Sequence, residues 1–503
     1  MLNNFDNRMY SESRWAREEE IKSSALKVDL TAEDYPGAGL PVCADKQTAY
    51  LDNSDTHTVI FGSTGSKKTR LFCMPMINMM IKAGESFVVT DPKGELFTKT
   101  SGMAKEKDYD LVVLNLRDIG KGDCWNPLGI PYEFYHNGNK DLAVSLLNDF
   151  MTTLSAPHRA VTKDIFWIET AASLGLANLL LLMECGREEE VHLGSFASMC
   201  TNKSMEELES ISSLLDENSI AGINYRSVFN SASNTLRSIL ISLYAMVRIF
   251  MTQRKLTNML SKNTFDARNF GRKKTAVYLI IPDEKSTYHF LITTFIKQVY
   301  ETLINEAQKE KDGKLPVRVN FVLDEFCNIP AIPDMSSMIS AARSRNMRYY
   351  LIVQGLRQLN AKYNLDAETI KGNCENWVFL TSKELALLNE ISDLCGTIVT
   401  GTGIQRKLIS VSELQRLDKS KGEVLILYGR KYPFITYLPD IDDYEMFKGY
   451  PSAPTPTHPV EACQTLSLRQ VLLDIKTERI HPFADEAPDN DAPDSDAEDE
   501  DSF

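Results

Sequence analysis

The class of fold follows from one stretch of the chain, Val59-Ile60-Phe61-Gly62-Ser63-Thr64-Gly65-Ser66-Lys67-Lys68-Thr69. An apolar run typical of a strand leads into a loop with two glycines, and helical periodicity begins near Thr69. In such a turn, successive backbone N–H groups point at one anion, and the N-terminus of the following helix adds partial positive charge. The stretch therefore predicts a strand, a phosphate-binding loop and a helix, in that order.

The loop has the spacing that binds nucleotide phosphates, with one departure. Lys68 is placed to reach the β- and γ-phosphate oxygens, and the hydroxyl of Thr69 is placed to ligate Mg²⁺. Lys67 stands where the pattern has its second glycine, so a Cβ and a long cation replace a residue of free backbone. Two interpretations are open: a working loop with an extra charge, or a nucleotide site that is weakened or lost. The residues expected to hold ATP are Gly62, Ser63, Thr64, Gly65, Ser66, Lys67, Lys68 and Thr69.

Short apolar runs alternate with helical stretches on both sides of this loop. Near-continuous apolar strands separated by helices are typical of βαβ units and of a parallel sheet buried on both faces. The sequence therefore predicts an α/β fold with a central, mostly parallel sheet. The predicted strands cover residues 58–61, 86–90, 111–114, 275–281, 317–323, 348–353, 377–380 and 423–428, and a helix is predicted over 69–83.

The strand pattern disappears between residues 140 and 258, where only helical periodicity remains. We therefore expect an all-α domain that interrupts the sheet. A Pro-rich linker follows residue 450, and then comes one short amphipathic helix over about 466–479. The predicted units are an N-terminal arm (1–50), a first part of the nucleotide-binding domain (51–139), the all-α domain (140–258), a second part of the nucleotide-binding domain (259–450) and a tail (451–503).

The chain has 503 residues and a net charge of −14. The last nineteen residues contribute ten acidic groups and no basic one, so the rest of the chain carries about −4. Such a tail is disordered by composition, and it could mimic nucleic acid, recruit a basic partner or keep the chain soluble. The nearly balanced body does not indicate a nucleic-acid binder by bulk charge, but it leaves room for local basic clusters.

The cysteines and the N-terminus indicate a reducing compartment. Nine cysteines are scattered without a C-x-x-C pair, which argues against disulfides and a zinc site. The first residues are polar and lack the apolar core of a signal peptide. The apolar windows 168–185 and 238–251 contain Glu169 and Arg248, so we expect buried helices rather than membrane spans. The predicted location is the cytoplasm, with access to the inner face of the cell membrane through a partner protein.

A second element supplies carboxylates. The apolar run Val319–Leu323 ends in Asp324-Glu325, and side chains at the carboxyl ends of parallel strands converge on one crevice. Asp324 is expected to face Mg²⁺ and Glu325 the attacking water. An ordinary strand end with two solvated acids is the alternative.

Taken together, six motifs resemble the type IV secretion coupling proteins, the TraG-like conjugation ATPases. The resemblance covers residues 50–445 in order, and its Asp-Pro-Lys-Gly-Glu and Trp-Asn-Pro-Leu motifs match other families with a phosphate-binding loop poorly. The motifs are residues 62–69, Thr90-Asp91-Pro92-Lys93-Gly94-Glu95-Leu96, Trp125-Asn126-Pro127-Leu128, Leu323-Asp324-Glu325-Phe326, 352–359 and 412–417.

The resemblance implies a RecA-like motor domain interrupted by an all-α domain. Such proteins are hexameric ATPases that bind ATP and Mg²⁺ and pass a relaxase with its single-stranded DNA, or protein effectors, to a type IV secretion channel. Lys68, Thr69, Asp324 and Glu325 would take the roles given above, and Gln354 would sense the γ-phosphate. Arg343 would be an arginine finger that reaches the nucleotide of a neighbouring subunit, with Arg345 the competing candidate and a solvated helix arginine the plain alternative.

Two departures from the family keep other functions open. Family members usually begin with membrane-spanning helices, which this sequence does not show, so we expect a soluble form that reaches the membrane through another protein. Lys67 is the second departure. A non-hydrolysing adaptor that recruits cargo, and an FtsK-like DNA pump for another process, are the alternative functions.

DNA contacts are predicted at three basic clusters, although most such runs are solvated faces. In the helical block, Tyr225, Phe229 and Arg237 are candidate contacts with cargo. The basic clusters are Arg254-Lys255, Arg268 with Arg272-Lys273-Lys274, and Arg343 with Arg345 and Arg348.

Overall fold

A nine-stranded sheet forms the centre of the computed structural model, which describes residues 13–159, 164–216, 219–399, 404–477 and 479–480. The strand order is β14-β13-β10-β4-β9-β8-β5-β7-β6. Strand β13 runs antiparallel to both of its neighbours, β14 and β10, and all other neighbouring pairs are parallel. The strands are β4 (Thr58–Phe61), β5 (Ser86–Asp91), β6 (Asp110–Asn115), β7 (Thr275–Ile280), β8 (Val319–Leu323), β9 (Met347–Val353), β10 (Asn376–Phe379), β13 (Glu423–Tyr428) and β14 (Phe434–Tyr437).

The inner strands are buried on both faces, as their apolar sequences require. All residues of β4, β5, β7, β8 and β9 are buried, which is the pattern of a parallel sheet covered by helices. The α/β prediction is confirmed. The helices of this part are α2 (Met74–Ala83), preceded by a π-helical turn (Thr69–Cys73), α3 (Glu95–Glu106), α12 (His289–Gln308), α13 (Met335–Ala342), α14 (Leu356–Tyr363), α15 (Asp366–Asn373), α16 (Leu385–Cys395) and α17 (Val411–Leu414).

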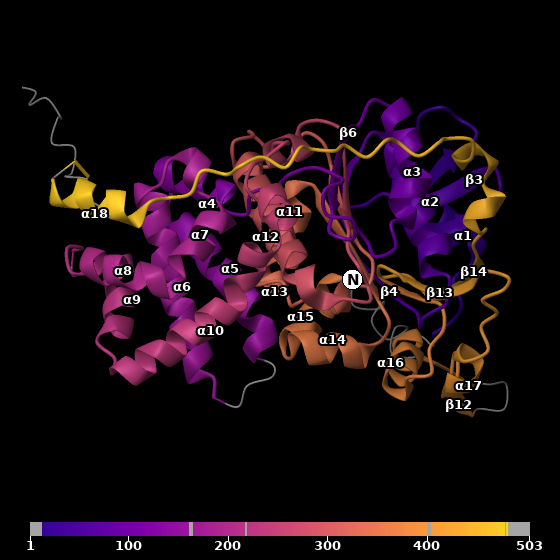
Figure 1. Ribbon diagram of the computed structural model, residues 1–503. Helices are drawn as coiled ribbons and strands as arrows, with labels where there is room; N and C mark the ends of the chain where they lie inside the picture. Colours follow the sequence, from indigo (N-terminus) through magenta and orange to yellow (C-terminus); the bar gives the residue numbers. More distant parts are fainter. Residues whose placement is uncertain (1–12, 160–163, 217–218, 400–403, 478, 481–503) are drawn as a thin grey trace, which may run out of the picture.

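The helical block is inserted between β6, at the edge of the sheet, and β7 (Figure 1). It begins near Gly129 rather than at 140, because α4 packs against α5. Residues 230–232 lie between two of its helices, one ending at Phe229 and the next beginning at Ser233. The helices are α4 (Gly129–His136), α5 (Lys140–Arg159), α6 (Phe166–Cys185), α7 (Leu193–Met199), α8 (Met205–Ser212), α9 (Ile220–Phe229), α10 (Ser233–Thr252) and α11 (Arg254–Met259).

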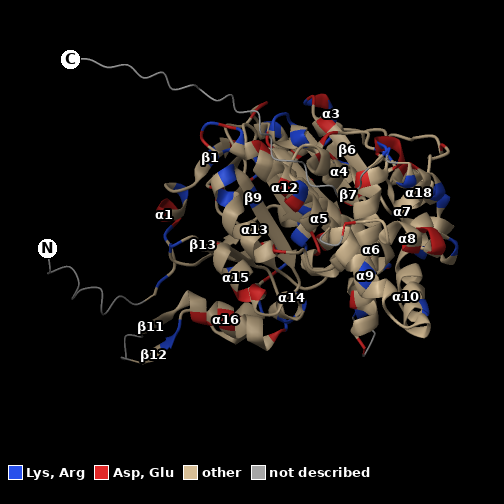
Figure 2. Cartoon of the chain, turned by 90° about the vertical axis from the view of Figure 1, so that its left-hand side faces the viewer, with Lys and Arg blue, Asp and Glu red and all other residues tan. Residues whose placement is uncertain are grey.

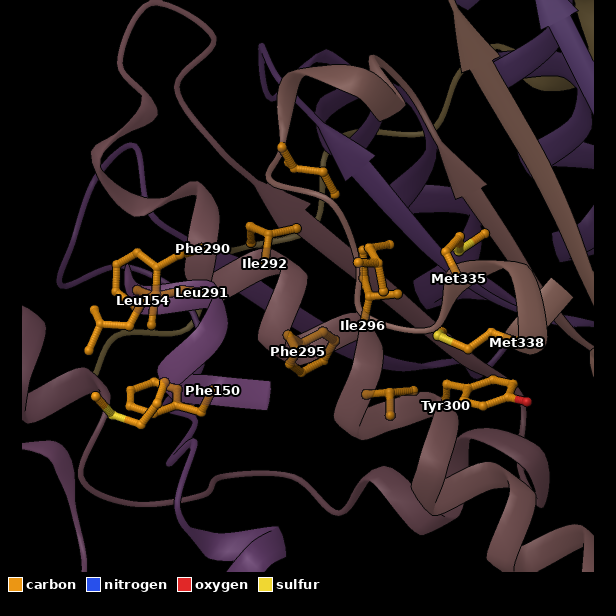
Figure 3. Close-up of a cluster of buried hydrophobic side chains, with 14 of the residues drawn as sticks. Phe150, Leu154, Phe290, Leu291, Ile292, Phe295, Ile296, Tyr300, Met335 and Met338 are labelled. Atoms are coloured by element: carbon orange, nitrogen blue, oxygen red, sulfur yellow. The ribbon is translucent and has the colours of Figure 1, made fainter. Parts of the chain in front are cut away.

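Helix α12 joins the two parts of the molecule. Most of its residues are buried, so it lacks a solvent-facing side over much of its length. In Figure 3, Phe290 lies toward Leu154 of α5, whereas Tyr300 lies toward Met338 of α13. One continuous apolar cluster therefore runs from the helical block to one face of the sheet.

Two helices of the block have the length and apolar composition of a membrane span, α6 and α10. Core helices of folded domains pass the same test. The most apolar window of α6 is 61% buried, between α5, α9 and α10, as predicted for residues 168–185. The window of α10 is only 33% buried, and Ile241 and Tyr244 on it are exposed. The helix predicted to be buried over 238–251 is therefore buried on one face only.

The N-terminal stretch contains a small sheet, so the prediction of an arm over residues 1–50 is wrong for its described part. Strands β1 (Leu26–Asp29), β2 (Leu40–Ala44) and β3 (Thr48–Asp52) pair antiparallel in the order β1-β3-β2. Alternate residues such as Val28, Val42 and Leu51 are buried in the cluster that covers the other face of the large sheet. These strands are short, and Gly and Pro residues between them obscure the period-two pattern.

The Pro-rich stretch is no free linker but a C-terminal strap (residues 451–467) that crosses both parts of the molecule (Figure 1, yellow). It ends in α18 (Leu468–Lys476), which packs on α8. Hydrogen bonds from the sheet side of the molecule and from the helical block hold it, so proline here gives a preset extended backbone rather than flexibility. The pairs are Ala453 N to Ser101 Oγ (3.0 Å), Gly122 N to Pro456 O (2.7 Å), Asn258 Nδ2 to Glu461 O (3.0 Å), His192 Nε2 with Gln464 O (2.8 Å) and Leu466 N to Ser195 Oγ (3.2 Å). The acidic tail (485–503) lies outside the described residues.

Arg348 is a structural residue, and its prediction as a DNA contact is wrong. Only 1% of it is exposed. It lies in β9 opposite Asn320 of β8, bonds Asn320 Oδ1 at 2.9 Å and the Ala38 carbonyl at 2.9 Å, and forms an ion pair with Glu85. A fully buried guanidinium is stable only because each of these partners replaces water.

Replacing Arg348 by methionine is expected to lower the free energy of unfolding by about 3–5 kcal/mol, because it removes the cation closest to the buried Glu85 carboxylate. Urea unfolding followed by intrinsic fluorescence measures the loss. The double variant Arg348→Met/Glu85→Leu removes both charges and is expected to recover much of the stability. A loss below about 1 kcal/mol in the single variant would show that the pair is not strongly coupled.

Candidate nucleotide-binding site

The carboxyl ends of three neighbouring strands lie side by side at one end of the sheet and bring the predicted site residues together. The loop 62–69 follows β4, Asp324 and Glu325 follow β8, and Gln354 follows β9, which lies between those two strands. The loop is tied to this edge by Gly62 N to Val353 O (3.1 Å) and Ser63 N to Thr381 O (2.9 Å). The backbone thus positions a phosphate-type loop opposite two carboxylates and an amide.

Lys68 folds back over the loop. Its ammonium donates to the carbonyls of Gly62 (2.6 Å) and Ser63 (3.3 Å) and lies 3.9 Å from Glu325 Oε1. The side chain is buried. Phosphate oxygens can replace backbone carbonyls around such an ammonium, so the lysine is already aimed at the space above the loop.

Lys67 keeps the backbone conformation of the glycine that it replaces. Its φ is 67°, in the left-handed region, and Gly65 has a φ of 76°. The turn is therefore preserved at the cost of some strain at a residue with a Cβ. Gly62 is required for a different reason, since a Cβ there would lie 2.4 Å from Ser66 Oγ. The Lys67 side chain points to a carboxylate, with Nζ 3.4 Å from Asp440 Oδ2.

The donors expected for Mg²⁺ lie in contact. Thr69 Oγ1 donates to Asp324 Oδ2 at 3.0 Å, and the Asp324 carbonyl accepts from Thr90 Oγ1 at 2.7 Å. Burial, reinforced by the neighbouring charge of Glu325, raises the pKa of Asp324 to about 6, so a cation would be favourable there. One hydroxyl and one carboxylate suit Mg²⁺, which keeps waters and phosphate oxygens as its other ligands. No group of three His, Cys, Asp or Glu side chains suited to a metal is found within the described ranges.

Glu325 is held by two amides. Its Oε2 accepts from Gln354 Nε2 at 2.7 Å and from Asn328 Nδ2 at 3.3 Å, while Oε1 faces Lys68. Its backbone is left-handed, with a φ of 53°. A strained, doubly hydrogen-bonded carboxylate is aimed at one place, which is the requirement for a base that orients water. Asn328 was not predicted, because nothing in its sequence context distinguishes it from a loop asparagine.

Two of the motifs on which the resemblance rests, residues 90–96 and 125–128, make contacts that support the fold. Asp91 accepts from Phe97 N at 2.8 Å and thereby shapes the turn into α3, and burial raises its pKa. Trp125 packs edge-on against Phe295, and Asn126 Nδ2 donates to Val191 O at 2.7 Å. The Trp-Asn-Pro-Leu motif therefore lies at the junction of the helical block and α12.

Arg343 is not brought to this site. It precedes β9, whose seven residues separate it from Gln354 by about 23 Å at 3.3 Å per residue. Its Nη1 lies 2.6 Å from Glu375 Oε1, and half of its side chain is exposed. Arg345, at the same edge, donates to Ala341 O and Ser344 Oγ. Either arginine could reach a nucleotide only on another molecule.

Of the other residues predicted to contact DNA, some have exposed side chains and others already form ion pairs. Arg254 and Lys255 are exposed. Arg268 is paired with Asp266 and Glu133, and Arg272 with Glu306 and Glu310. In Figure 2, basic and acidic positions are interspersed over the visible helices.

Tyr225 is fully buried in the helical block and cannot contact cargo as predicted. Its hydroxyl donates to Asn178 Oδ1 at 2.9 Å, and its ring stacks on Phe229. Helical spacing is the same for an aromatic residue that packs in the core and for one that contacts a partner, so the sequence pattern does not distinguish the two roles.

The sheet order and this constellation define an α/β protein of the RecA-like P-loop class, in which the loop strand and the carboxylate strand are separated by one strand. Residues 7–422 match the family model for type IV secretory system conjugative DNA transfer. The chain belongs to this family of type IV coupling proteins, and the resemblance seen in its motifs is confirmed.

Relatives and solved structures agree with this placement. Two conjugal transfer proteins TraG of Escherichia coli are 22% identical, over 85% of this chain and 75% of the relative in one case and 77% and 65% in the other. The plasmid coupling protein TrwB in complex with the ATP analogue ADPNP has a TM-score of 0.63 at 13% identity, covering 90% of this chain and 97% of TrwB. TrwB with ADP and Mg²⁺ has a TM-score of 0.61 at 11% identity, covering 88% and 95%. These structures share the fold of this chain.

Proposed function

We propose that this chain binds ATP and Mg²⁺ and hydrolyses ATP between the subunits of a homo-oligomer, a hexamer, to deliver a relaxase with its single-stranded DNA, or protein effectors, to a type IV secretion channel. The observation that carries the proposal is the meeting of Lys68, Thr69, Asp324, Glu325 and Gln354 at one sheet edge. Further support comes from TrwB, which is seen with ADPNP and with ADP and Mg²⁺.

The residues divide the work of phosphoryl transfer. Backbone N–H groups of the loop and Lys68 hold the β- and γ-phosphates, and Thr69 with Asp324 would hold Mg²⁺. When bound, the ion would supply positive charge that offsets charge developing on the phosphate oxygens. Glu325 accepts a hydrogen bond from the attacking water, and Gln354 keeps that carboxylate oriented, at 2.7 Å in this structure. Arg343 of a neighbouring subunit stabilises the transferred group.

We further place the chain in the cytoplasm, at the inner face of the cell membrane, through a membrane-anchored partner. Nine free cysteines agree with a reducing compartment. The family match supports transfer through a secretion system over an FtsK-like pump for another process.

A non-hydrolysing adaptor that recruits cargo is the second candidate, and Lys67 is the observation that favours it. The left-handed backbone of Lys67 carries strain that the usual glycine avoids. Two observations argue against the adaptor: the turn is preserved, and the Lys68 ammonium donates to the loop carbonyls.

Replacing Lys67 by glycine separates the two candidates. Glycine removes about 1–2 kcal/mol of backbone strain and a partly exposed ion pair of smaller worth. The motor predicts that ATP hydrolysis is already present in the native chain, changes little in Lys67→Gly, and falls at least about 100-fold in Lys68→Ala. Steady-state phosphate release with and without single-stranded DNA measures this. Hydrolysis that appears only in Lys67→Gly would identify the native chain as an adaptor.

A further inference from the structure

Asp440 is the carboxylate closest to the unusual lysine of the loop. Its Oδ2 lies 3.4 Å from Lys67 Nζ and 3.0 Å from Arg70 Nε, and its Oδ1 accepts from Arg70 Nη2. Arg70 also pairs with Asp442. Two cations that flank Lys68 in sequence are therefore both held by one short acidic turn.

The turn fixes Asp440 independently of the loop. Asp440 precedes a short 3₁₀ turn (Ile441–Asp443), its Oδ1 accepts from Asp442 N at 3.3 Å, and its own N–H donates to Asp443 Oδ2 at 3.1 Å. This turn follows β14, and Leu438 N donates to Gly422 O at 3.0 Å. The Asp440 carboxylate is therefore held in place by its own turn, and the side chains of Lys67 and Arg70 reach it there.

The ion pairs are accessible to water and can exchange partners. The side chains of Lys67 and Arg70 are 34% and 41% exposed, and that of Asp440 is 20% exposed. Burial opposes ionisation of Asp440, but the hydrogen bonds from Arg70 and the Asp442 amide bring its pKa below the usual range. A charged carboxylate with partly solvated partners competes with other anions for them.

We propose that Asp440 competes with the nucleotide phosphates for Lys67 and Arg70, and so weakens the affinity of the loop for nucleotide. Asp440 is in this sense a positioning residue that sets affinity through two other side chains. The inference rests on the proposed function, since it presumes a phosphate ligand on the loop. It accounts for a lysine in the place of a glycine, because the added cation is held aside while its backbone keeps the turn.

The electrostatics give a direction and a dependence on ligand charge. Removing the Asp440 charge raises the net positive charge beside the loop by one and frees Lys67, whereas Arg70 keeps its ion pair with Asp442. An anionic ligand then binds more tightly, and ATP gains more than ADP because it carries more negative charge. Added salt reduces the gain, because the side chains are partly exposed.

The test compares Asp440→Asn with Asp443→Asn in the full chain. Asparagine at 440 can still accept from Arg70 and from the Asp442 amide. Asp443→Asn is the matched control, because it removes the same charge three residues away, its ion pair is with Lys46 rather than with the loop, and asparagine there can still accept from Asp440 N. Binding of ATP, ADP and inorganic tripolyphosphate is measured by calorimetry at low and high salt.

Asp440→Asn is expected to bind ATP about threefold to tenfold more tightly than the native chain, with a smaller gain for ADP and none in Asp443→Asn. Tripolyphosphate is expected to show the same gain as ATP, because the effect acts on phosphates. In the background Lys67→Ala/Arg70→Ala, the Asp440→Asn change is expected to have no effect.

Two outcomes overturn the inference alone. In the first, the native chain binds ATP and a folded Asp440→Asn variant binds it equally or more weakly. In the second, Asp440→Asn still increases the affinity for ATP in the Lys67→Ala/Arg70→Ala background. A native chain and an Asp440→Asn variant that both fail to bind ATP would instead contradict the proposed function. Circular dichroism of each variant establishes that it is folded.

Discussion

Glu325→Gln is expected to reduce the rate of ATP hydrolysis by about 10²- to 10⁴-fold, the usual contribution of a positioned general base. Glutamine keeps the size of the side chain and can still meet the amides of Gln354 and Asn328, which lie 2.7 and 3.3 Å from Glu325 Oε2. What it loses is the charge that orients water. Binding of ATP should therefore persist, and phosphate release in single-turnover experiments should slow.

Asn328→Ala provides a graded control. It removes the weaker of the two hydrogen bonds to Glu325 and leaves the carboxylate in place. Its effect on hydrolysis should be much smaller than that of Glu325→Gln. Equal hydrolysis by Glu325→Gln and the native chain would show that this carboxylate is not the base.

Arg343→Ala is expected to lower hydrolysis by about 10³-fold or more, as for other arginines supplied in trans to a phosphoryl group. The residue lies at the opposite edge of the sheet from its own loop, so any contribution has to come from a neighbour. Mixing the inactive Arg343→Ala and Glu325→Gln chains should restore part of the activity. Some interfaces then combine an intact Arg343 with an intact Glu325.

Arg345→Ala identifies which arginine acts. Arg345 is hydrogen-bonded within its own turn, so its replacement should leave most of the hydrolysis. If Arg345→Ala abolishes hydrolysis and Arg343→Ala does not, the assignment is reversed. If mixing Arg343→Ala with Glu325→Gln restores nothing while both chains still associate, the two residues do not act across an interface.

The sheet was predictable because its strands are buried on both faces. The apolar runs of β5, β7 and β9 have no exposed position that could blur them, and the spacing of the loop is specific enough to place Lys68 and Thr69. The carboxylates Asp324 and Glu325 follow from a strand end of the same kind. Local sequence is sufficient to predict a site residue when one element determines both the position of its side chain and its chemical role.

Features that depend on distant partners were not predictable. Arg348 looks like a surface arginine until Glu85 and Ala38, hundreds of residues earlier, are seen to surround it. Asp440 lies 373 residues after Lys67 in the numbering, and no pattern connects the two. The C-terminal strap likewise has the sequence of a Pro-rich linker, because its hydrogen bonds go to residues far away in the chain.

The most direct test of a site completed by a neighbouring subunit is the rate of ATP hydrolysis per subunit as the protein concentration is raised, with Mg²⁺ and single-stranded DNA present and the mass of the particle measured in parallel. The expected result is a rate per subunit that rises as the chain assembles into a ring and is lost in Lys68→Ala. A chain that remains a monomer and hydrolyses ATP at a rate per subunit independent of concentration would contradict it.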